Sequence, residues 1–355
     1  MQLDMHFYAV YALARSAGIK SETAKTIAYA SQFVDDAIDD EAVILSNTMA
    51  ILPTMTSHRP IDYKNAMPGD QWKVWVPFHF LPGNQPIKGS FVEKMMCRKN
   101  SKPSKKMLGD SLKPQNTDYW PHLIGICSHV FADTFSHFGF IGFAHPWNKA
   151  ITHTINASHK HSPGILNYVK AKFEDFKTRF AGNFAEIVPV GHGGVGTYPD
   201  RPYLKWHFQY ETGKHRSTDT NRDNSSNFLA ATRELYRYFQ NFVNVSPKEK
   251  DPDLHVKNNL FDVIKEILKQ EAPLNERISS WKEHIASGAF FDNIDDTDRH
   301  IEYVNDLWRP RRAAYEGQNV DKIEYTDACR FIRAAIRHRE YVLHELLPDM
   351  GLIIF

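Results

Sequence analysis

Most of the chain carries apolar residues at the spacing of three to four positions that is typical of an amphipathic helix. Segments 6–17 and 21–34 show this spacing first, and Ser21 after Gly18 makes a helix start. The same pattern predicts further helices over 121–138, 164–181, 205–212, 226–243, 257–270, 276–287, 298–316 and 325–346. One segment, 71–82, alternates aromatic and β-branched residues and predicts a strand. We therefore expect a mainly α fold with minor β structure.

Three polar stretches interrupt the helical pattern. The stretches 217–227 and 244–253 indicate a boundary, so we expect a helical domain over 1–250 and a helical C-terminal extension over 251–355, separate from it or packed into it. The stretch 97–110 is basic and contains Ser and Pro, which predicts a loop, either solvated or in contact with a lipid headgroup or a partner.

The overall composition excludes some classes of protein. With 355 residues, of which 42% are hydrophobic, the chain can bury a large core. The formal net charge is only +1, so no global field recruits nucleic acid or an anionic membrane. The three cysteines, Cys97, Cys127 and Cys329, are far apart and form no CxxC motif. They argue against a disulfide framework and against a thiolate zinc site.

The first eighteen residues do not read as a secretory signal. They have no basic region, and Asp4 and His6 interrupt their apolar residues. No run approaches the roughly 20 apolar residues of a membrane span. We expect a chain made as a soluble cytoplasmic protein, with any export, or translocation into a host cell, by a route that needs no cleaved leader.

The segment 121–138 places ionisable side chains on one face of an apolar helix. His129, Asp133 and His137 are four residues apart, and His122 falls on the same stripe because it precedes His129 by seven residues. The remaining faces are apolar, so the helix is expected to be buried and its polar groups must be paired or bound to a metal ion. A metal site is favoured, and a buried polar network is the alternative.

A second pair has the same spacing. His207 and Glu211 lie four residues apart, and on a helix they would present an imidazole and a carboxylate together. Ten of the eighteen histidines lie between His122 and His215, a concentration that surface use does not predict. Imidazole and carboxylate ligands without thiolate favour zinc or a similar divalent ion.

Other candidates precede the central helix. Asp35 and Asp36 end a predicted helix, where acidic residues are unfavourable unless a cation balances them. A solvated acidic turn is the alternative. His79 lies between two phenylalanines, and the chain begins with the pair Asp4 and His6.

At these residues the sequence resembles the zinc-dependent phospholipase C and P1 nuclease superfamily, an all-helical fold around three zinc ions. In order, that superfamily has an amino-terminal ligand region, an Asp after the early helices, a His in an aromatic segment, a His-x3-Asp followed by His, and a His-x3-Glu. Within it the chain looks most like leaderless bacterial phosphatidylcholine-hydrolysing phospholipases C, some of them exported as effectors. The metal ligands that this resemblance implies are Asp4, His6, Asp36 or Asp35, His79, His129, Asp133, His137, His207 and Glu211.

The sequence also departs from the superfamily. Better-known members use the free amine of a processed chain as a ligand, whereas here Gln2 disfavours removal of Met1, and the spacing from Asp133 to His137 is about two residues shorter. One metal site is therefore open to a different construction, with Asp4, His6, His122 or His192 as substitutes. His192 lies in a glycine-rich turn that could approach a phosphate.

The resemblance implies a zinc phospholipase C with two or three metal ions. It would hydrolyse phosphatidylcholine at a membrane surface to diacylglycerol and phosphocholine, with Asp36 or Asp35 orienting or deprotonating the attacking water. No nucleic-acid partner is expected. A P1-like nuclease or another metal-dependent phosphodiesterase is the first alternative, and a non-catalytic metal-binding protein is the second.

Overall fold

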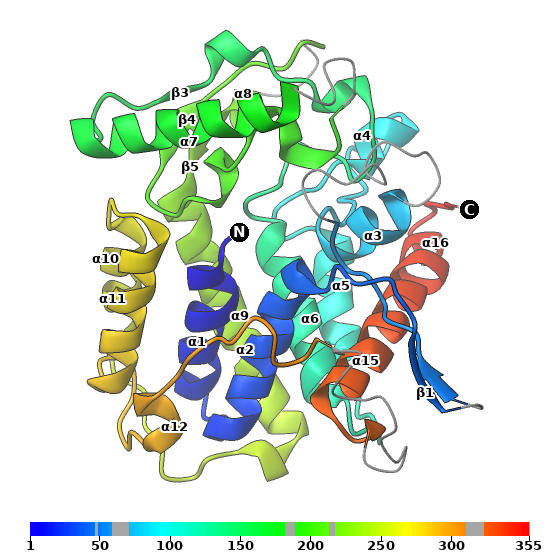
Figure 1. The fold of residues 1–355 in the computed structure, drawn as a ribbon, viewed down its shortest axis with the longest axis vertical. Coiled ribbons are helices and arrows are strands. Elements are labelled where there is room, and N and C mark those ends of the chain that lie inside the picture. The colour runs from blue at the N-terminus through cyan, green and yellow to red at the C-terminus, as the bar shows by residue number, and fades with distance from the viewer. Residues whose placement is uncertain (47–48, 59–70, 182–188, 213–216, 310–322, 355) are drawn as a thin grey trace.

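The computed structural model describes residues 1–46, 49–58, 71–181, 189–212, 217–309 and 323–354, and within them the fold is mainly α, as predicted (Figure 1). The α-helices are α1 (Val10–Ser16), α2 (Ser21–Asp36), α3 (Gln71–Phe78), α4 (Phe91–Met95), α5 (Lys102–Ser111), α6 (Trp120–Asp133), α7 (Pro163–Ala181), α8 (Ser217–Thr220), α9 (Asn224–Val245), α10 (Leu260–Lys269), α11 (Leu274–Ala286), α12 (Asp296–Arg299), α15 (Asp327–Tyr341) and α16 (Leu347–Asp349). The π-helices are η1 (Asp4–Ala9) and η8 (Val342–Leu346). The 3-10 helices are η3 (Pro146–Asn148), η4 (Thr152–Thr154), η5 (Gly191–Val195), η6 (Tyr198–Asp200) and η7 (Pro247–Glu249).

Five short strands form two antiparallel sheets. They are β1 (Val43–Ser46), β2 (Met49–Ile51), β3 (Asn156–Ala157), β4 (Lys205–His207) and β5 (Asn221–Asp223). Strands β1 and β2 pair with each other, and β4 is the central strand between β3 and β5. The three-stranded sheet and α7 lie above the helical bundle in Figure 1.

Helix α6 runs through the centre of the bundle. It packs against α2, α5, α9 and α15, and each of its residues except Pro121 is buried. Gly125 makes the closest of these contacts possible, because a Cβ atom there would lie 2.3 Å from the Ile27 carbonyl oxygen of α2. The close approach brings the C-terminal halves of α2 and α6, with their polar side chains, next to each other.

Two hydrophobic clusters meet around the end of α6. The larger one fills the bundle and includes residues from the N-terminal helices as well as Trp281 and Leu346 of the predicted C-terminal extension. The smaller one lies under the three-stranded sheet and α7, and it includes Phe140, Trp206 and Phe208. Residues between these two clusters are therefore positioned by both parts of the fold.

Two predictions of secondary structure type are wrong. The predicted strand 71–82 forms helix α3, which packs on α6 and α15 and ends near Pro77, whose carbonyl accepts a hydrogen bond from His338. The predicted helix 205–212 instead begins with strand β4, where exposed and buried side chains alternate through Tyr210. In both segments the contacts with neighbouring elements, not the local pattern, select the backbone conformation.

Three other predictions need correction at their boundaries. The predicted loop 97–110 contains helix α5, which Ser101 caps by accepting a hydrogen bond from the Ser104 amide. The predicted helix 298–316 is helical only to Arg299, its residues 300–309 are irregular, and residues 310–316 lie outside the described part. Helix α6 ends at Asp133 and not at 138. The other predicted helices are present with small shifts of their ends.

The described residues bear on two further expectations, one about membrane-spanning helices and one about the cysteines. None of their helices combines the length and the apolar character that a membrane crossing requires. Cys97, Cys127 and Cys329 are free thiols, as predicted.

Candidate metal centre

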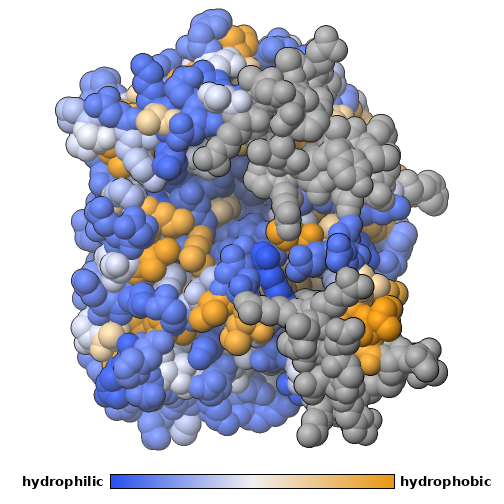
Figure 2. All heavy atoms as spheres, in the orientation of Figure 1, coloured by the Kyte–Doolittle hydropathy of each residue, from blue (hydrophilic) through white to orange (hydrophobic). Residues whose placement is uncertain are grey.

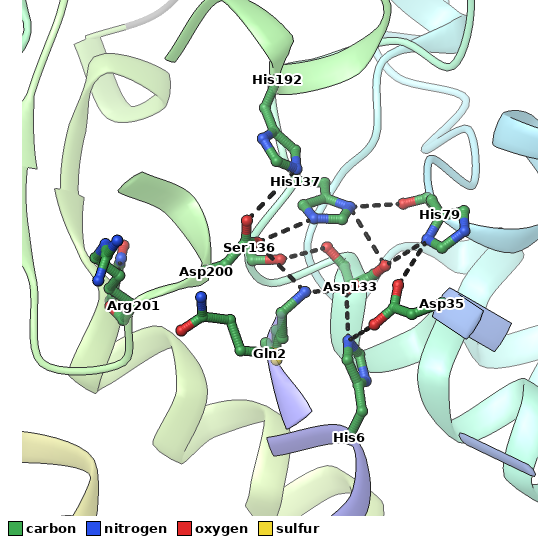
Figure 3. Close-up of polar contacts among 12 residues, drawn as sticks. Gln2, His6, Asp35, His79, Asp133, Ser136, His137, His192, Asp200 and Arg201 are labelled. Atoms are coloured by element: carbon green, nitrogen blue, oxygen red, sulfur yellow. Dashed lines mark hydrogen bonds and ion pairs between the residues drawn. The ribbon is translucent and has the colours of Figure 1, made fainter. Parts of the chain in front are cut away.

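Eight imidazole and carboxylate side chains converge where the two hydrophobic clusters meet (Figure 3). They form three groups, within each of which the potential ligand atoms lie within 4.8 Å of one another. The groups are His6, His129 and Asp133; Asp35, His79 and His129; and His137, His192 and Asp200. These residues come from η1, the end of α2, the residue after α3, α6 and the turn after it, η5 and η6.

The carboxylate of Asp133 lies at the centre of this arrangement and is fully buried. Its two oxygens face different partners. Oδ1 lies 2.6 Å from the amino group of Met1 and 3.2 Å from Nε2 of His6. Oδ2 lies 3.2 Å from His79, 3.1 Å from His129 and 3.4 Å from His137. A carboxylate with nitrogen donors around both oxygens is suited to bridge two metal ions.

Four of the histidines are held by a backbone carbonyl on one ring nitrogen and direct the other nitrogen inward. The outward contacts are His129 Nδ1 to Ser31 (2.8 Å), His79 Nε2 to Thr56, His137 Nδ1 to His79 and His192 Nδ1 to Gly196 (each 2.9 Å). A carbonyl oxygen only accepts, so each of these outer nitrogens carries the proton and donates it. Hydrogen bonds of this kind commonly fix the tautomer of a metal-binding histidine.

The inner nitrogens consequently face other acceptors. Nε2 of His129 lies 3.1 Å from an oxygen of Asp133 and 3.2 Å from Nδ1 of His79. Nε2 of His137 lies 3.3 Å from an oxygen of Asp200. For His129 and His79, neutral imidazoles with these tautomers place lone pairs against lone pairs, which is unfavourable unless a cation lies between them. The chain's own groups thus fit a bound metal ion.

The first of the three groups contains a histidine without hydrogen bonds. Both ring nitrogens of His6 are buried and have no hydrogen-bond partner among the described residues, although Nε2 lies near Asp133. A buried polar atom of this kind is costly unless a ligand satisfies it. The His6 ring stacks on the ring of His129 with centroids 3.8 Å apart, which holds both imidazoles beside Asp133.

Burial keeps His6, His129 and His192 neutral, as a metal ligand must be. Burial and the positive charge of the Met1 amine together lower the pKa of His6 to about 4. Burial likewise lowers the pKa of His192 to about 4 and that of His129 well below its ordinary value. Nearby carboxylates act in the opposite direction without reversing these shifts.

The carboxyl groups divide into two kinds. Burial would raise the pKa of Asp133 and Asp200, but the surrounding imidazoles and the Met1 amine outweigh it and lower both. Asp35 has a pKa well above its ordinary value, because burial and the charges of Asp133, Asp36 and Asp200 disfavour its ionised form more than the Met1 amine favours it. Two carboxylates with opposed shifts in one site are a pattern of acid–base catalysis.

The Met1 amine balances part of this negative charge. Burial lowers its pKa, but the charges of Asp133, Asp200 and Asp35 together raise the pKa to about 11. The amine lies 3.3 Å from Asp200 as well as 2.6 Å from Asp133. It is thus a nitrogen donor at the point where two of the groups approach each other.

The turn after α6 returns His137 to Asp133. The Thr134 hydroxyl donates to the Phe131 carbonyl, and such local bonds compete with helix continuation. The His137 amide donates to the Asp133 carbonyl. The buried guanidinium of Arg222 then donates to the carbonyls of Ser136 and Phe138, on either side of His137. This clamp holds the histidine in place although it lies beyond the helix.

One side of the site is open to solvent. The Asp35 side chain is 30% exposed, whereas His129 and Asp133 are inaccessible. The N-terminus lies near the middle of the molecule in Figure 1, and Figure 2 shows that face hollowed there, with hydrophilic residues in the hollow. A ligand would therefore reach the groups from the side of Asp35.

Six of the side chains proposed from the sequence lie in the three groups. One of the other proposed substitute ligands lies there as well. The six are His6, Asp35, His79, His129, Asp133 and His137, and the substitute is His192. Asp4 lies apart from them, because its carboxylate contacts Nε of the buried Arg277 at 3.1 Å. Asp36 also lies apart and accepts hydrogen bonds from Gln32 and Tyr303.

The pair His207 and Glu211 is not brought to the groups. Both side chains are exposed, and the nearest charged partner of Glu211 is Lys149, at 4.0 Å. His122 is also elsewhere, with its Nε2 3.1 Å from Asp327 on α15. The helical stripe argument fails for His122 because it lies two turns before His129, beside a different neighbour of α6.

Asp200 is the one carboxylate of the groups that sequence reasoning missed. It follows Tyr198 and Pro199 in η6, a short turn that closes against the glycine-rich segment of His192. The signal in the sequence was an acidic residue directly after an aromatic residue and proline, within ten residues of a candidate histidine. No regular spacing joins the two residues, so a periodicity search cannot find them.

The fold and the site together define a mainly helical protein with imidazole and carboxylate groups that could hold metal ions. The chain belongs to a family of unknown function (DUF6765), whose model matches residues 1–346. No curated protein and no solved structure matches the chain.

Proposed function

We propose that the chain is a zinc-dependent phosphoric diester hydrolase that acts as a phospholipase C on phosphatidylcholine. The observation that carries the proposal is the set of buried imidazoles of His6, His79 and His129, each of which has a ring nitrogen facing an oxygen of Asp133. Nitrogen and oxygen donors without thiolate suit zinc or a similar divalent ion. The two-sided contacts of Asp133 favour more than one ion.

Three ions would fit this arrangement, two of them on opposite sides of Asp133. Its carboxylate would be shared between His6 on one side and His79 and His129 on the other, with the positively charged Met1 amine beside it. The third ion would lie among His137, His192 and Asp200. When bound, such ions neutralise the non-bridging phosphate oxygens and lower the pKa of a water molecule to near neutral.

Asp35 is the residue best suited to handle the proton of the attacking water. It is the most exposed carboxylate of the three groups, and its raised pKa makes it a stronger base than an ordinary aspartate. Asp36, the other candidate from the sequence, hydrogen-bonds to the phenol of Tyr303 and faces away from the groups. We therefore assign the role of general base to Asp35.

The order of the grouped residues along the chain supports the resemblance to the phospholipase C and P1 nuclease superfamily. His6, Asp35, His79, His129, Asp133 and His137 follow the implied order. The departure lies in the last pair, where His192 and Asp200 take the place expected for His207 and Glu211.

Aromatic side chains support a lipid headgroup at this site. The half-buried Trp75 ring lies 5.0 Å from the ring of His79, and the Phe80 ring stacks on His137 at 4.7 Å. An aromatic face beside a phosphate site suits the quaternary ammonium of choline. The formal net charge of +1 offers no general attraction to a nucleic acid.

The test is release of diacylglycerol from phosphatidylcholine by purified protein, measured together with its metal content. We expect release that needs zinc, stops with chelator and is lost in Asp133→Ala. His207→Ala is the matched control, because it removes an exposed histidine outside the groups, and it should retain both metal and activity.

Each other outcome changes the proposal in a definite way. Hydrolysis of single-stranded nucleic acid in place of phosphatidylcholine would identify a P1-like nuclease. Stoichiometric zinc without turnover of either substrate would identify a non-catalytic metal-binding protein. Protein that binds no divalent ion would exclude the metal centre itself.

A further inference from the structure

A short excursion of the chain projects from the bundle between α3 and α5. Backbone hydrogen bonds from Gly83 to Met96 and from Asn84 to Lys94 close its base. At its tip the Gly89 amide donates to the Pro86 carbonyl, and Ser90 caps α4 in a capping box with Glu93. The excursion is therefore an ordered projection whose tip residues are held in a defined conformation.

The excursion shares one corner of the molecule with α5 and the C-terminal residues. The Asn84 side chain donates to the Met350 carbonyl at 2.7 Å, and Lys106 of α5 lies 3.9 Å from Asp349. Figure 1 places α4, α16 and the C-terminus at the same edge of the molecule. We call residues 83–106 together with residues 349–354 the basic corner.

The basic corner exposes large apolar side chains. Ile87 at the tip is 85% exposed, Phe91 on α4 is 49% exposed and Ile353 is 59% exposed. They come from two segments that are far apart in the sequence but adjacent in space. Neighbouring exposed apolar residues, unlike scattered ones, indicate an interaction surface.

The same corner is strongly cationic. It contains seven Lys and Arg residues against two acidic residues, Glu93 and Asp349, which gives a formal charge of +5 in a chain whose total is +1. Arg98 pairs with Asp219, and Lys106 pairs with Asp110. Five lysines have no ion pair among the residues that the structure describes, namely Lys88, Lys94, Lys99, Lys102 and Lys105, and Lys99 donates to the neutral Asn227 side chain.

We propose that the basic corner docks the protein on an anionic membrane surface. Lysines attract the headgroups, and Ile87 and Phe91 at the tip enter the interface between headgroups and acyl chains. Ile87, the most exposed of these side chains, offers a nucleic acid neither a stacking ring nor a hydrogen bond, which disfavours a nucleic acid as the partner. The proposal concerns binding alone, although a phospholipase would benefit from being held at its substrate surface.

The experiment is binding of the full chain, in chelator, to vesicles of phosphatidylcholine with and without phosphatidylglycerol. Chelator prevents turnover, so the result does not depend on the metal centre. We expect binding to the anionic vesicles that weakens as salt is raised. The variant Lys88→Gln with Lys94→Gln should bind about 30-fold more weakly, because each lysine near an anionic surface contributes about a fivefold factor.

A second variant separates the apolar contribution from the charge. Ile87→Ser with Phe91→Ser should weaken binding at every salt concentration, because it removes insertion and leaves the charge unchanged. The matched control is Val256→Ser with Lys265→Gln, which changes exposed residues of the same kinds beside α10, on the opposite side in Figure 1. It should bind like the unaltered protein.

Three results would overturn the proposal. The first is the absence of binding to anionic vesicles at low salt. The second is equal binding by the corner variants and the control. The third is loss of self-association, or of duplex DNA binding, in the corner variants while vesicle binding stays unchanged. Failure of the catalytic proposal would leave vesicle binding intact, so the two proposals fail separately.

Discussion

Two buried polar clusters lie along the N-terminal helical segment, and they differ in how their atoms pair. Around His6, inner imidazole nitrogens face carboxylate oxygens and each other, so acceptors lie against acceptors. Further along the same segment, Tyr11 and Arg15 donate to Asp298, so donors lie against acceptors. The first cluster could hold a cation from outside the chain, whereas the second is satisfied by the chain itself.

The second cluster has a structural role that follows from its contacts. Both nitrogens Nε and Nη2 of Arg15 lie 2.8 Å from the Asp298 carboxylate, and Nη1 lies 2.9 Å from Asp251 and 2.8 Å from the Ile19 carbonyl. The Tyr11 hydroxyl donates to Asp298 at 2.6 Å. The network fastens the segment 251–298 to the N-terminal helix. Burial alone, then, does not distinguish a functional cluster from a structural one, but the pairing of donors with acceptors does.

The largest expected effect is loss of metal and activity in Asp133→Asn. Activity should fall about 10³-fold or more, because the ions held by this carboxylate supply several kcal/mol of transition-state stabilisation. In chelator the free energy of unfolding should fall by about 2 kcal/mol or less, since the asparagine keeps an oxygen for the Met1 ammonium and its amide N–H can donate to an imidazole lone pair. Metal analysis and urea unfolding in chelator test both parts. A large loss of metal-free stability would contradict the acceptor-against-acceptor description.

Asp298→Asn should lower the stability and leave the metal content unchanged. It leaves the buried Arg15 guanidinium without its bidentate partner, and breaking such a pair costs about 3–5 kcal/mol. Metal content per folded molecule should not change. Urea unfolding measures this loss of stability. The double variant Arg15→Met with Asp298→Leu, which removes both charges, should be more stable than Asp298→Asn. Equal metal loss in Asp298→Asn would show that the two clusters are not independent.

A comparison of two pairs tests the position of the third ion. His192→Ala and Asp200→Asn should each remove about one metal equivalent, because a site of three protein ligands rarely survives the loss of one. His207→Ala and Glu211→Gln, the pair expected from the sequence, should keep the full metal content. Metal analysis of the four purified variants decides between the pairs, and loss of metal in the second pair would restore the original assignment.

The smallest effect concerns a buried histidine outside both clusters. Burial and the charge of Arg337 lower the pKa of His338 to about 4, although the hydrogen bond to the Pro77 carbonyl opposes the shift. The unfolded chain then binds more protons between pH 6.5 and 4, so stability falls as the pH decreases through this window. His338→Gln keeps a hydrogen-bond donor for the Pro77 carbonyl but does not titrate. Between pH 7.5 and 5 its free energy of unfolding should therefore fall by about 2 kcal/mol less than that of the unaltered protein. Urea unfolding at the two pH values measures the difference. An equal loss of stability in both proteins would contradict the lowered pKa of His338.

Local patterns predicted some parts of the site well. His129 and Asp133 share a helical face because the spacing of four residues places them there. His137 also reaches the site, but by a different path, because the helix ends at Asp133 and a turn held by Arg222 brings the histidine back. The same spacing was misleading for His207 and Glu211, where Trp206, Phe208 and Tyr210 alternate with exposed residues and form part of the second hydrophobic cluster.

The sequence by itself determined the mainly helical fold, the free cysteines and the chemical type of the site. These follow from spacing and composition, which act over a few residues or over the whole chain. Only the tertiary structure decided which carboxylates take part. It selected Asp35 over Asp36, removed Asp4 by pairing it with Arg277, and joined Asp200 to His192. The reason is that burial and charge balance depend on groups far apart in the chain, such as Arg277 beside Asp4, which no local pattern records.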